Sequence, residues 1–173
     1  KRCMRLAVDA AGIKPGLEPR GVTAFQIEGR TFEQDPTGSL RFLSRALERI
    51  RSVPGILSVS ATSDLPLAGR WNDRLALGLQ APRTTDENCE ITAVTPGYFR
   101  TLGIGQRVGR AFQASDENLD HLVVVVDRDL AERYWPGSDP VGKVVWVGPY
   151  RHPGYVVGVV EAAHPTGLLT PAI

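Results

Sequence analysis

The sequence predicts an α+β protein that is built from short elements, in one domain or in two small lobes. One amphipathic helix lies between two stretches of alternating polarity within residues 22–62. A nearly continuous apolar run at 121–126 is typical of a strand that is buried on both faces. The 18 glycines and 13 prolines favour many turns between short elements. A chain of 173 residues is long enough for two small lobes that share a core.

The first region reads as a strand–helix–strand unit. Residues 22–28 alternate so that one face is partly apolar, which predicts a strand. The Asp-Pro pair at 35–36 is a good helix start, because Asp can cap exposed amides and Pro fits the first turn. The Pro-Gly pair at 54–55 ends this helix. Residues 56–62 alternate again, and we expect this second strand to pair in parallel with the first. The apolar residues of the helix recur at steps of three and four; they are Leu40, Leu43, Ala46, Leu47, Ile50 and Val53.

The second region contains further strands and two short helices. Its expected strands are residues 74–81, 89–95, 121–126, 143–147 and 155–160, and its expected helices are 96–102 and a run that starts at 127 or 128. Residues 1–20 read as an extended lead-in, and the residues from Glu161 onward read as a loop.

The composition is that of a folded globular protein and excludes several classes of function. Hydrophobic residues make up 42% and charged residues 23%, so disorder of the bulk is not expected. The 20 basic and 19 acidic residues leave a net charge of +1, and no basic stripe interleaved with aromatics argues for nucleic acid. No apolar run approaches the roughly 18 residues that cross a bilayer. The chain begins at Lys1, and we expect it to be a piece of a longer protein.

A glycine-rich stretch at 103–110, GIGQRVGR, does not fit a nucleotide-binding loop. Such a loop needs G-x-G-x-x-G between a strand and a helix. Here the third glycine comes one place late, and no helix-forming run follows it. Turn glycines explain the stretch better, so we expect no cofactor.

The histidines do not predict a metal site. His121, His152 and His164 are far apart in the sequence and lack the spacing of metal ligands. His152 and His164 each precede a proline, which is typical of solvated loops. The two cysteines, Cys3 and Cys89, do not imply a disulfide framework either.

Acidic residues are the remaining candidates for catalysis. Ser60 or Ser63 with Asp64 could join a histidine in a triad, but the sequence has no G-x-S-x-G elbow. Asp127, Asp129 and Glu132 fall near the first turn of an expected helix, where the helix dipole stabilises acids and arginines lie within a turn. The sequence therefore predicts no catalytic residue and a protein that is not an enzyme.

The stretch YWPG at 134–137 reads as rigid packing at the end of that helix. Two large aromatic side chains have area to bury there. Pro136 and Gly137 then force a stop and a fixed turn.

Four ordered stretches are more specific than any single motif. They are LERIRSVPGILSVSATSDLPLAG (47–69), AVTPGYFRTLGIGQRVGRAF (93–112), VVVVDRDLAERYWPGSDPVGKVV (123–145) and YVVGVV (155–160). Together they resemble the MacB-like periplasmic core domain of FtsX-like ABC transporter permeases. The likeness covers about residues 22–168 and is strongest to duplicated permeases of the orphan type, which have no dedicated partner gene.

The resemblance implies a division into two lobes. Residues 1–21 would be an extended lead-in that follows a transmembrane helix. Residues 22–64 and 151–173 would form a porter-like lobe that is incomplete at the C-terminus, and residues 65–150 would be an inserted mixed α/β lobe of the sabre type. An incomplete porter-like lobe would leave an exposed sheet edge.

The resemblance also implies the function. The chain would lie on the periplasmic side of a cytoplasmic (inner) membrane protein. It would couple the motion of the membrane helices and the ATPase to the handling of a substrate or partner, without chemistry of its own. Its partners would be the transmembrane helices of the parent permease, a separate cytoplasmic ATPase subunit, and a second permease copy or a periplasmic partner. Nucleic acid is not expected.

Two other functions stay open. A small soluble hydrolase-like enzyme would use acids near Asp64 or Asp127, and it would need a pocket with an acid or base of shifted pKa. A periplasmic adaptor would need a large exposed apolar patch. Arg70, Trp71 and Asn72 form a candidate contact surface, because exposed Trp is enriched at binding surfaces.

Overall fold

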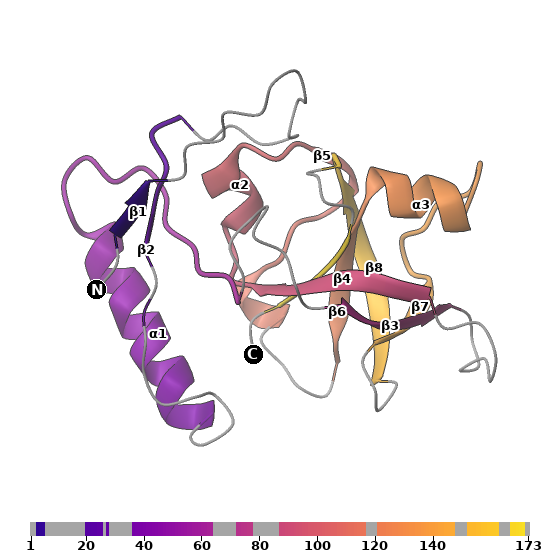
Figure 1. Ribbon diagram of the computed structural model, residues 1–173, viewed down its shortest axis with the longest axis horizontal. Helices are drawn as coiled ribbons and strands as arrows, with labels where there is room; N and C mark the ends of the chain where they lie inside the picture. Colours follow the sequence, from indigo (N-terminus) through magenta and orange to yellow (C-terminus); the bar gives the residue numbers. More distant parts are fainter. Residues whose placement is uncertain are drawn as a thin grey trace.

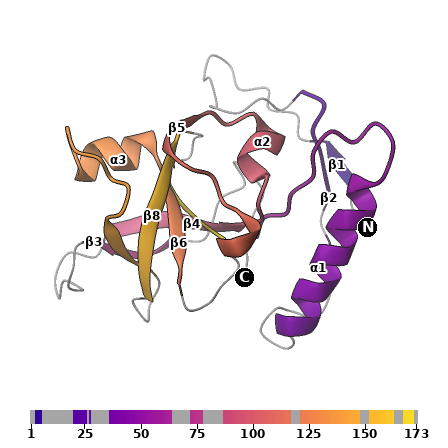
Figure 2. The same cartoon turned by 180° about the vertical axis from the view of Figure 1, so that it is seen from behind.

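The computed structural model describes residues 3–5, 20–25, 27, 36–63, 72–77, 87–116, 121–147, 152–162 and 167–171. Within these residues the chain mixes helices and strands (Figures 1 and 2), in agreement with the predicted class. The strands are β1 (Cys3–Arg5), β2 (Thr23–Phe25), β3 (Asn72–Leu77), β4 (Glu87–Val94), β5 (Gln106–Gly109), β6 (Val123–Asp127), β7 (Val144–Val147), β8 (His152–Val160) and β9 (Gly167–Pro171). The helices are α1 (Pro36–Arg51), α2 (Tyr98–Leu102), α3 (Arg128–Tyr134) and the 3-10 helix η1 (Ala114–Asp116).

β8 is the strand around which the larger sheet is arranged. This sheet has seven strands in the order β5-β8-β6-β9-β4-β3-β7. One edge of β8 runs parallel to β6, while the other edge pairs antiparallel with β7 through residues 152–155 and with β5 through residues 158–160. β7 also pairs with β3, so the series of pairings returns to β8. One strand therefore fixes the positions of three neighbours.

The buried core lies on the two faces of β6. Val124, Val125 and Val126 are each 0% exposed, as the apolar run predicted. Because side chains alternate along a strand, Val124 and Val126 pack with α3 on one face, while Val125 packs with α2 on the other. The apolar cluster on the α2 face includes Phe99 and Phe112, whose rings stack with centroids 5.8 Å apart. Burial of each valine contributes about 2 kcal/mol, so β6 alone supplies several kcal/mol.

α1 belongs to a part of the molecule that lies beside the larger sheet. In Figures 1 and 2, α1, β1 and β2 lie together on one side, α3 lies on the remote side of the sheet, and α2 lies between them. β1 and β2 form a separate antiparallel pair. The predicted amphipathic helix is confirmed, but its apolar stripe is only half-buried and adds nothing to the described core; this stripe is Leu40, Leu43, Ala46, Leu47 and Ile50.

The expected strand at 56–62 is wrong. These residues form no strand, apart from an isolated bridge between Thr62 and Val94, and β2 pairs with β1 instead. The alternation of large apolar residues with Ser does not correspond to an alternation in burial. Leu57 is 97% exposed, while residues 58–62 are all half-buried. Ser58 hydrogen-bonds to Thr101 of α2.

The loop expected after Glu161 is also wrong in part, because residues 167–171 form β9. This strand lies between β4, to which it is parallel, and β6, to which it is antiparallel. Its short GLLTP stretch has no clear period, so its strand conformation depends on partners that are distant in the sequence. β1 and β5 were likewise not expected as strands.

β5 forms one end of the larger sheet and has a protected outer edge. All four of its residues are exposed. The side-chain amide of Gln106 donates to the backbone oxygen of Gly109, and Arg107 carries a charge along the strand. These features block the addition of another strand.

The larger sheet joins strands from both predicted lobes. β8 and β9 fall in the range expected for the porter-like lobe, yet they pair with β3, β4, β5, β6 and β7 between them. The expected border near residue 150 is therefore not a border of the sheet, and the division into lobes stays a prediction. None of the helices in the described residues has the length and apolar character that a bilayer crossing requires.

A close approach between β8 and the residue after β5 leaves no room for a side chain at Gly158. A Cβ added there would lie 2.2 Å from the backbone oxygen of Arg110. We expect Gly158→Ala to lower the free energy of unfolding by about 2–4 kcal/mol, measured by denaturant unfolding. Gly137→Ala is the control: Gly137 has a φ of 71° but no atom within 4 Å of the added carbon, so strain alone should cost about 1–2 kcal/mol. Equal losses would contradict the packing argument.

Candidate functional site

β6 ends at a carboxylate that starts the next helix. Asp127 is the last residue of β6 and the N-cap of α3, with φ −81° and ψ 166°. Its Oδ1 accepts a hydrogen bond of 2.8 Å from the backbone N–H of Leu130. Only 3% of Asp127 is exposed. The predicted helix start is confirmed, and this acid stabilises the first turn of the helix.

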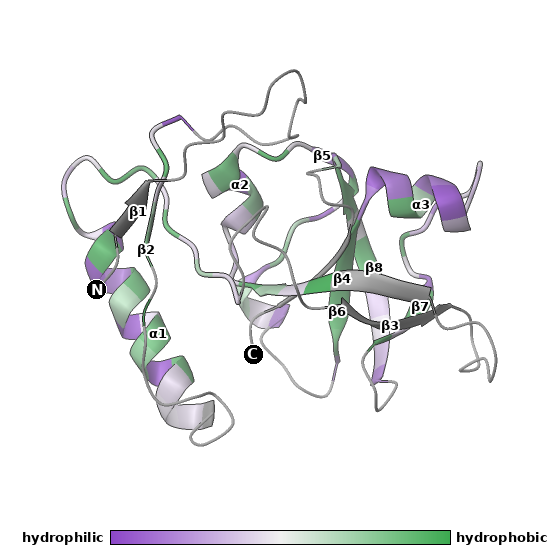
Figure 3. Ribbon diagram, in the orientation of Figure 1, coloured by the Kyte–Doolittle hydropathy of each residue, from purple (hydrophilic) through white to green (hydrophobic). Residues whose placement is uncertain are grey.

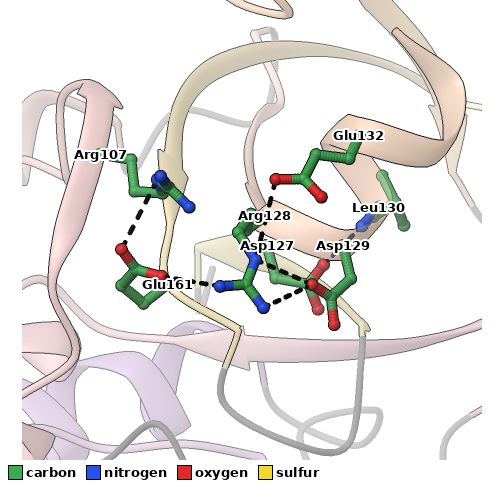
Figure 4. A network of polar contacts seen from close by, with 7 residues as sticks. All are labelled: Arg107, Asp127, Arg128, Asp129, Leu130, Glu132 and Glu161. Atoms are coloured by element: carbon green, nitrogen blue, oxygen red, sulfur yellow. Dashed lines mark hydrogen bonds and ion pairs between the residues drawn. The ribbon is translucent and has the colours of Figure 1, made fainter. Parts of the chain in front are cut away.

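Arg128 is the centre of an ion network at this corner of the fold (Figure 4). Its Nη2 lies 2.9 Å from Oδ1 of Asp129, and its Nη1 lies 3.5 Å from Oε2 of Glu161. Glu132 is more distant, with 3.9 Å between Oε1 and Nε of Arg128. Arg107 of β5 lies 3.5 Å from Oε1 of Glu161. The hydrogen bond with Asp129 is the main reason that the pKa of Arg128 is raised. The network joins β5, α3 and the residue after β8.

The carboxylates of this network are occupied by structural contacts. Asp127 caps α3, Asp129 and Glu132 face Arg128, and Glu161 lies between two arginines. A general acid or base instead needs a pKa near the working pH and a free path to a substrate. The network thus does not favour the enzyme alternative at Asp127, whereas Asp64 lies outside the described residues.

The predicted absence of a metal site is tested only in part. Among the residues that the structure describes, no group of three His, Cys, Asp or Glu side chains could hold a metal ion. His121 and His152 are both exposed, and His164 lies outside the described residues. Cys3 and Cys89 lie in β1 and β4, which belong to different sheets.

The aromatic pair at the end of α3 packs as expected. Tyr134 and Trp135 are partly buried against the core cluster on the α3 face, with ring centroids 6.3 Å apart. The backbone N–H of Ser138 donates to the oxygen of Trp135, and Gly137 has a φ of 71° in this turn. The stretch YWPG therefore fixes the end of the helix against the core.

A second polar cluster links the α1 side of the molecule to the sheet, and we call it the joint. It consists of residues 58–63 and residues 93–101. The backbone N–H of Ala61 donates to Oγ1 of Thr95 at 2.8 Å, and the N–H of Thr95 donates to the oxygen of Ala61 at 3.0 Å. The N–H of Ser63 donates to the oxygen of Ala93 at 2.9 Å, and the N–H of Ala93 donates to Oγ of Ser63 at 3.2 Å. Two reciprocal pairs of hydrogen bonds therefore attach this segment to the end of β4.

Two further hydroxyl contacts extend the joint to α2. Oγ of Ser58 lies 2.6 Å from Oγ1 of Thr101. The buried phenol of Tyr98 hydrogen-bonds to Thr62, but burial has the larger effect and raises the pKa of Tyr98 to about 12. Tyr98 is therefore neutral at physiological pH. Because Thr95 is only 6% exposed, water competes poorly for the central contacts of the joint.

The expected contact surface at 70–72 is not brought into either cluster. Arg70 and Trp71 lie outside the described residues, and Asn72 is the first residue of β3, paired with Glu90 of β4. The structure thus leaves this prediction untested. The sequence analysis missed the joint, because Ser and Thr at 58–63 gave the same alternation as a strand. The stretch at 93–101 was expected as the end of a strand and a short helix and as part of the resemblance, with no hydrogen-bonding role.

A third polar contact lies behind β5. Arg110 donates from Nη1 to Oδ2 of Asp116 at 2.6 Å and from Nη2 to Oδ1 at 2.8 Å. The backbone N–H of Gln113 adds a bond of 2.7 Å to the same carboxylate. Arg110 is the main reason that the pKa of Asp116 is lowered, with Gln113 contributing, although burial opposes both.

The fold and the joint define a mixed α/β scaffold domain, in which polar contacts link elements that are far apart in the sequence. A family model for the MacB-like periplasmic core domain matches residues 15–172. The chain therefore belongs to this family of ABC transporter permease domains, and the resemblance noted from its motifs is confirmed.

Individual relatives agree with this assignment. The macrolide export ATP-binding/permease protein MacB of Neisseria gonorrhoeae is 32% identical over 79 residues, which are 46% of this chain and 12% of that protein. The crystal structure of the periplasmic region of MacB from Actinobacillus actinomycetemcomitans has a TM-score of 0.57 at 21% identity and covers 75% of this chain and 54% of that chain. The extracellular domain of the transporter YknZ from Gram-positive bacteria has a TM-score of 0.54 at 20% identity, over 76% and 63% of the two chains. The chain thus spans a small part of its curated relative, and the solved structures support the fold.

We expect the Arg110–Asp116 contact to give a stability difference that depends on pH. The pKa of Asp116 in the folded protein lies below its ordinary value of 3.8, so the stabilisation is complete above that pH and is lost as the pH falls through the lowered pKa. Asp116→Asn should lower the free energy of unfolding by about 2 kcal/mol at pH 7 and by clearly less near pH 3. Denaturant unfolding at both pH values measures this.

The control is Glu132→Gln, because Glu132 is 69% exposed and its ion pair is long at 3.9 Å. This variant should change stability by at most about 0.5 kcal/mol at either pH. An Asp116→Asn cost that stays constant from pH 7 to pH 3 would contradict the charge argument.

Proposed function

We propose that this chain is the periplasmic domain of an ABC permease in a cytoplasmic (inner) membrane and that it couples membrane motion to the handling of cargo or a partner. ATP hydrolysis on a cytoplasmic ATPase would drive the motion, and the domain would pass it on without chemistry of its own. Membership of the MacB-like family supports this proposal. Neither the relatives nor the two clusters favour the enzyme or the adaptor.

The joint is the single observation that carries this proposal. The chain passes from α1 to the sheet through residues 52–63, and the second half of this segment is hydrogen-bonded to the end of β4. Gly55, with a φ of 88°, and the exposed Leu57 precede the bonded half. A hydrogen-bonded turn followed by a segment that is bonded to β4 is suited to transmit a pull on α1 to the sheet, because several hydrogen bonds share the load.

The division of labour between the two sides follows from this arrangement. We assign residues 22–64 to a porter-like part that receives motion from the lead-in at 1–21. We assign the larger sheet, with the 65–150 insert and β8, to the part that contacts cargo or a partner. The candidate contact surface at Arg70, Trp71 and Asn72 would lie beside β3 in this second part. A second permease copy or a periplasmic protein would be the partner.

Loss of the Thr95 hydroxyl should uncouple transport from ATP hydrolysis. In Thr95→Val the N–H of Ala61 loses its acceptor at 2.8 Å, which costs about 1 kcal/mol and leaves the domain folded. In the complete permease with its ATPase, reconstituted in proteoliposomes, we expect transport to fall about fivefold or more while ATP hydrolysis stays within about twofold. A macrolide is the probe, because MacB of Neisseria gonorrhoeae is named for macrolide export.

Two controls make this test specific. Thr95→Ser keeps the hydroxyl and should transport like the parent. Ser58→Cys with Thr101→Cys, whose hydroxyl oxygens lie 2.6 Å apart, should allow a disulfide that restores coupling to Thr95→Val under oxidising conditions. Equal transport by the Val and Ser variants would contradict the proposal.

A further inference from the structure

Three arginines of α1 share one exposed face. Arg41, Arg45 and Arg49 follow one another at steps of four residues, so their side chains lie one above the other at intervals of about 6 Å. All three are exposed, and none has an ion-pair partner among the residues that the structure describes. This differs from Arg107, Arg110 and Arg128, which all face carboxylates.

α1 is strongly basic within a nearly neutral chain. The helix contains Arg41, Arg45, Arg49 and Arg51 but only one acid, Glu48, and so carries a net charge of +3. The whole chain has a net charge of +1, so the remaining residues are net acidic. The whole-chain composition hides this local excess, which is why the sequence did not indicate a basic surface.

One exposed apolar side chain borders the arginine face, and three more follow the end of the helix. Phe42 follows Arg41 directly and is 58% exposed. Just beyond the helix, Val53, Ile56 and Leu57 are 51%, 42% and 97% exposed. Figure 3 shows apolar and hydrophilic residues alternating along α1. A basic helix face with aromatic and aliphatic neighbours is typical of helices that lie at the surface of a membrane.

We propose that this face of α1 docks onto the anionic phospholipid headgroups of the membrane. The inference rests on the proposed function, because that function places the domain next to a membrane. Arginine forks bind phosphate oxygens in pairs, which an array of headgroups supplies. Phe42 and Leu57 would enter the interfacial region beside them.

The layout of the face favours lipid over an acidic protein. A protein interface concentrates apolar residues at its centre and depletes charge there. On α1 the centre of the exposed face is charged, with Arg41, Arg45 and the single acid Glu48, while Arg49 and Phe42 lie toward one border. Docking would keep α1 at the membrane surface, next to the membrane helices whose motion the joint would pass to the larger sheet.

The test is the partition of the 173-residue chain onto lipid vesicles, followed by co-sedimentation. We expect binding to vesicles that contain phosphatidylglycerol and none to vesicles of phosphatidylcholine alone. Because screening shortens the reach of charges, raising NaCl from about 0.05 M to about 0.5 M should release most of the bound protein. This salt test needs no variant and so holds even if a variant fails to fold.

Variants then locate the binding face. The triple change Arg41→Gln, Arg45→Gln and Arg49→Gln should weaken partition on the order of 100-fold, at about fivefold for each arginine. The matched control removes the same charge from exposed positions elsewhere and should bind within about threefold of the parent on the same scale; it is Arg100→Gln, Arg133→Gln and Lys143→Gln.

The outcomes separate this inference from the function that it rests on. Equal loss in the two triple variants, or no partition of the parent chain onto anionic vesicles, would overturn lipid docking and point to an acidic protein as the occupant. Neither result bears on the transport assay of the Thr95 variants. Selective loss in the α1 variant, with full salt sensitivity, would support it.

Discussion

The complete burial of β6 on both faces is the constraint on which the rest of the structure depends. Three consecutive valines exclude water, so one face must be covered by α3 and the other by α2. The buried strand ends at Asp127, whose side chain caps the first turn of α3. The ion network around Arg128 then ties the start of α3 to β5 and to the end of β8. The hydrophobic requirement of one strand thus positions the polar residues around it.

Local patterns in the sequence predict this central part well. The apolar run at 121–126, the Asp-led helix after it and the aromatic stop each contain their own signal within a few residues. β9 and β1 do not, because a short stretch becomes a strand only when a distant partner offers free backbone groups. The segment at 56–62 shows the opposite error: its sequence alternates like that of a strand, but Ser58 and Ala61 bond to residues of the stretch 93–101, which is remote in the sequence.

The candidate site shows the same division. Asp127 could be assigned to a structural role from its place before a helix, and the structure agrees. The joint could not be predicted, since Ser and Thr are common at surface positions and their spacing does not indicate which residues they hydrogen-bond to. Its chemistry suits a mechanical role, because neutral hydroxyls and a phenol with a raised pKa keep their contacts over a wide range of pH. A link made of exposed ion pairs would instead weaken as ionic strength rises.

The protected outer edge of β5 affects how copies of this domain behave at high concentration. An unpaired strand edge presents a row of free backbone groups to any other copy of the domain. Two copies with such an edge could pair strand to strand and form one continuous sheet, and each added copy would offer a new free edge. The hydrogen bond from Gln106 to Gly109 and the charge of Arg107 make the outer edge of β5 a poor template for such pairing. The outer edge of β5 therefore disfavours aggregation of the domain by strand pairing, even at high concentration.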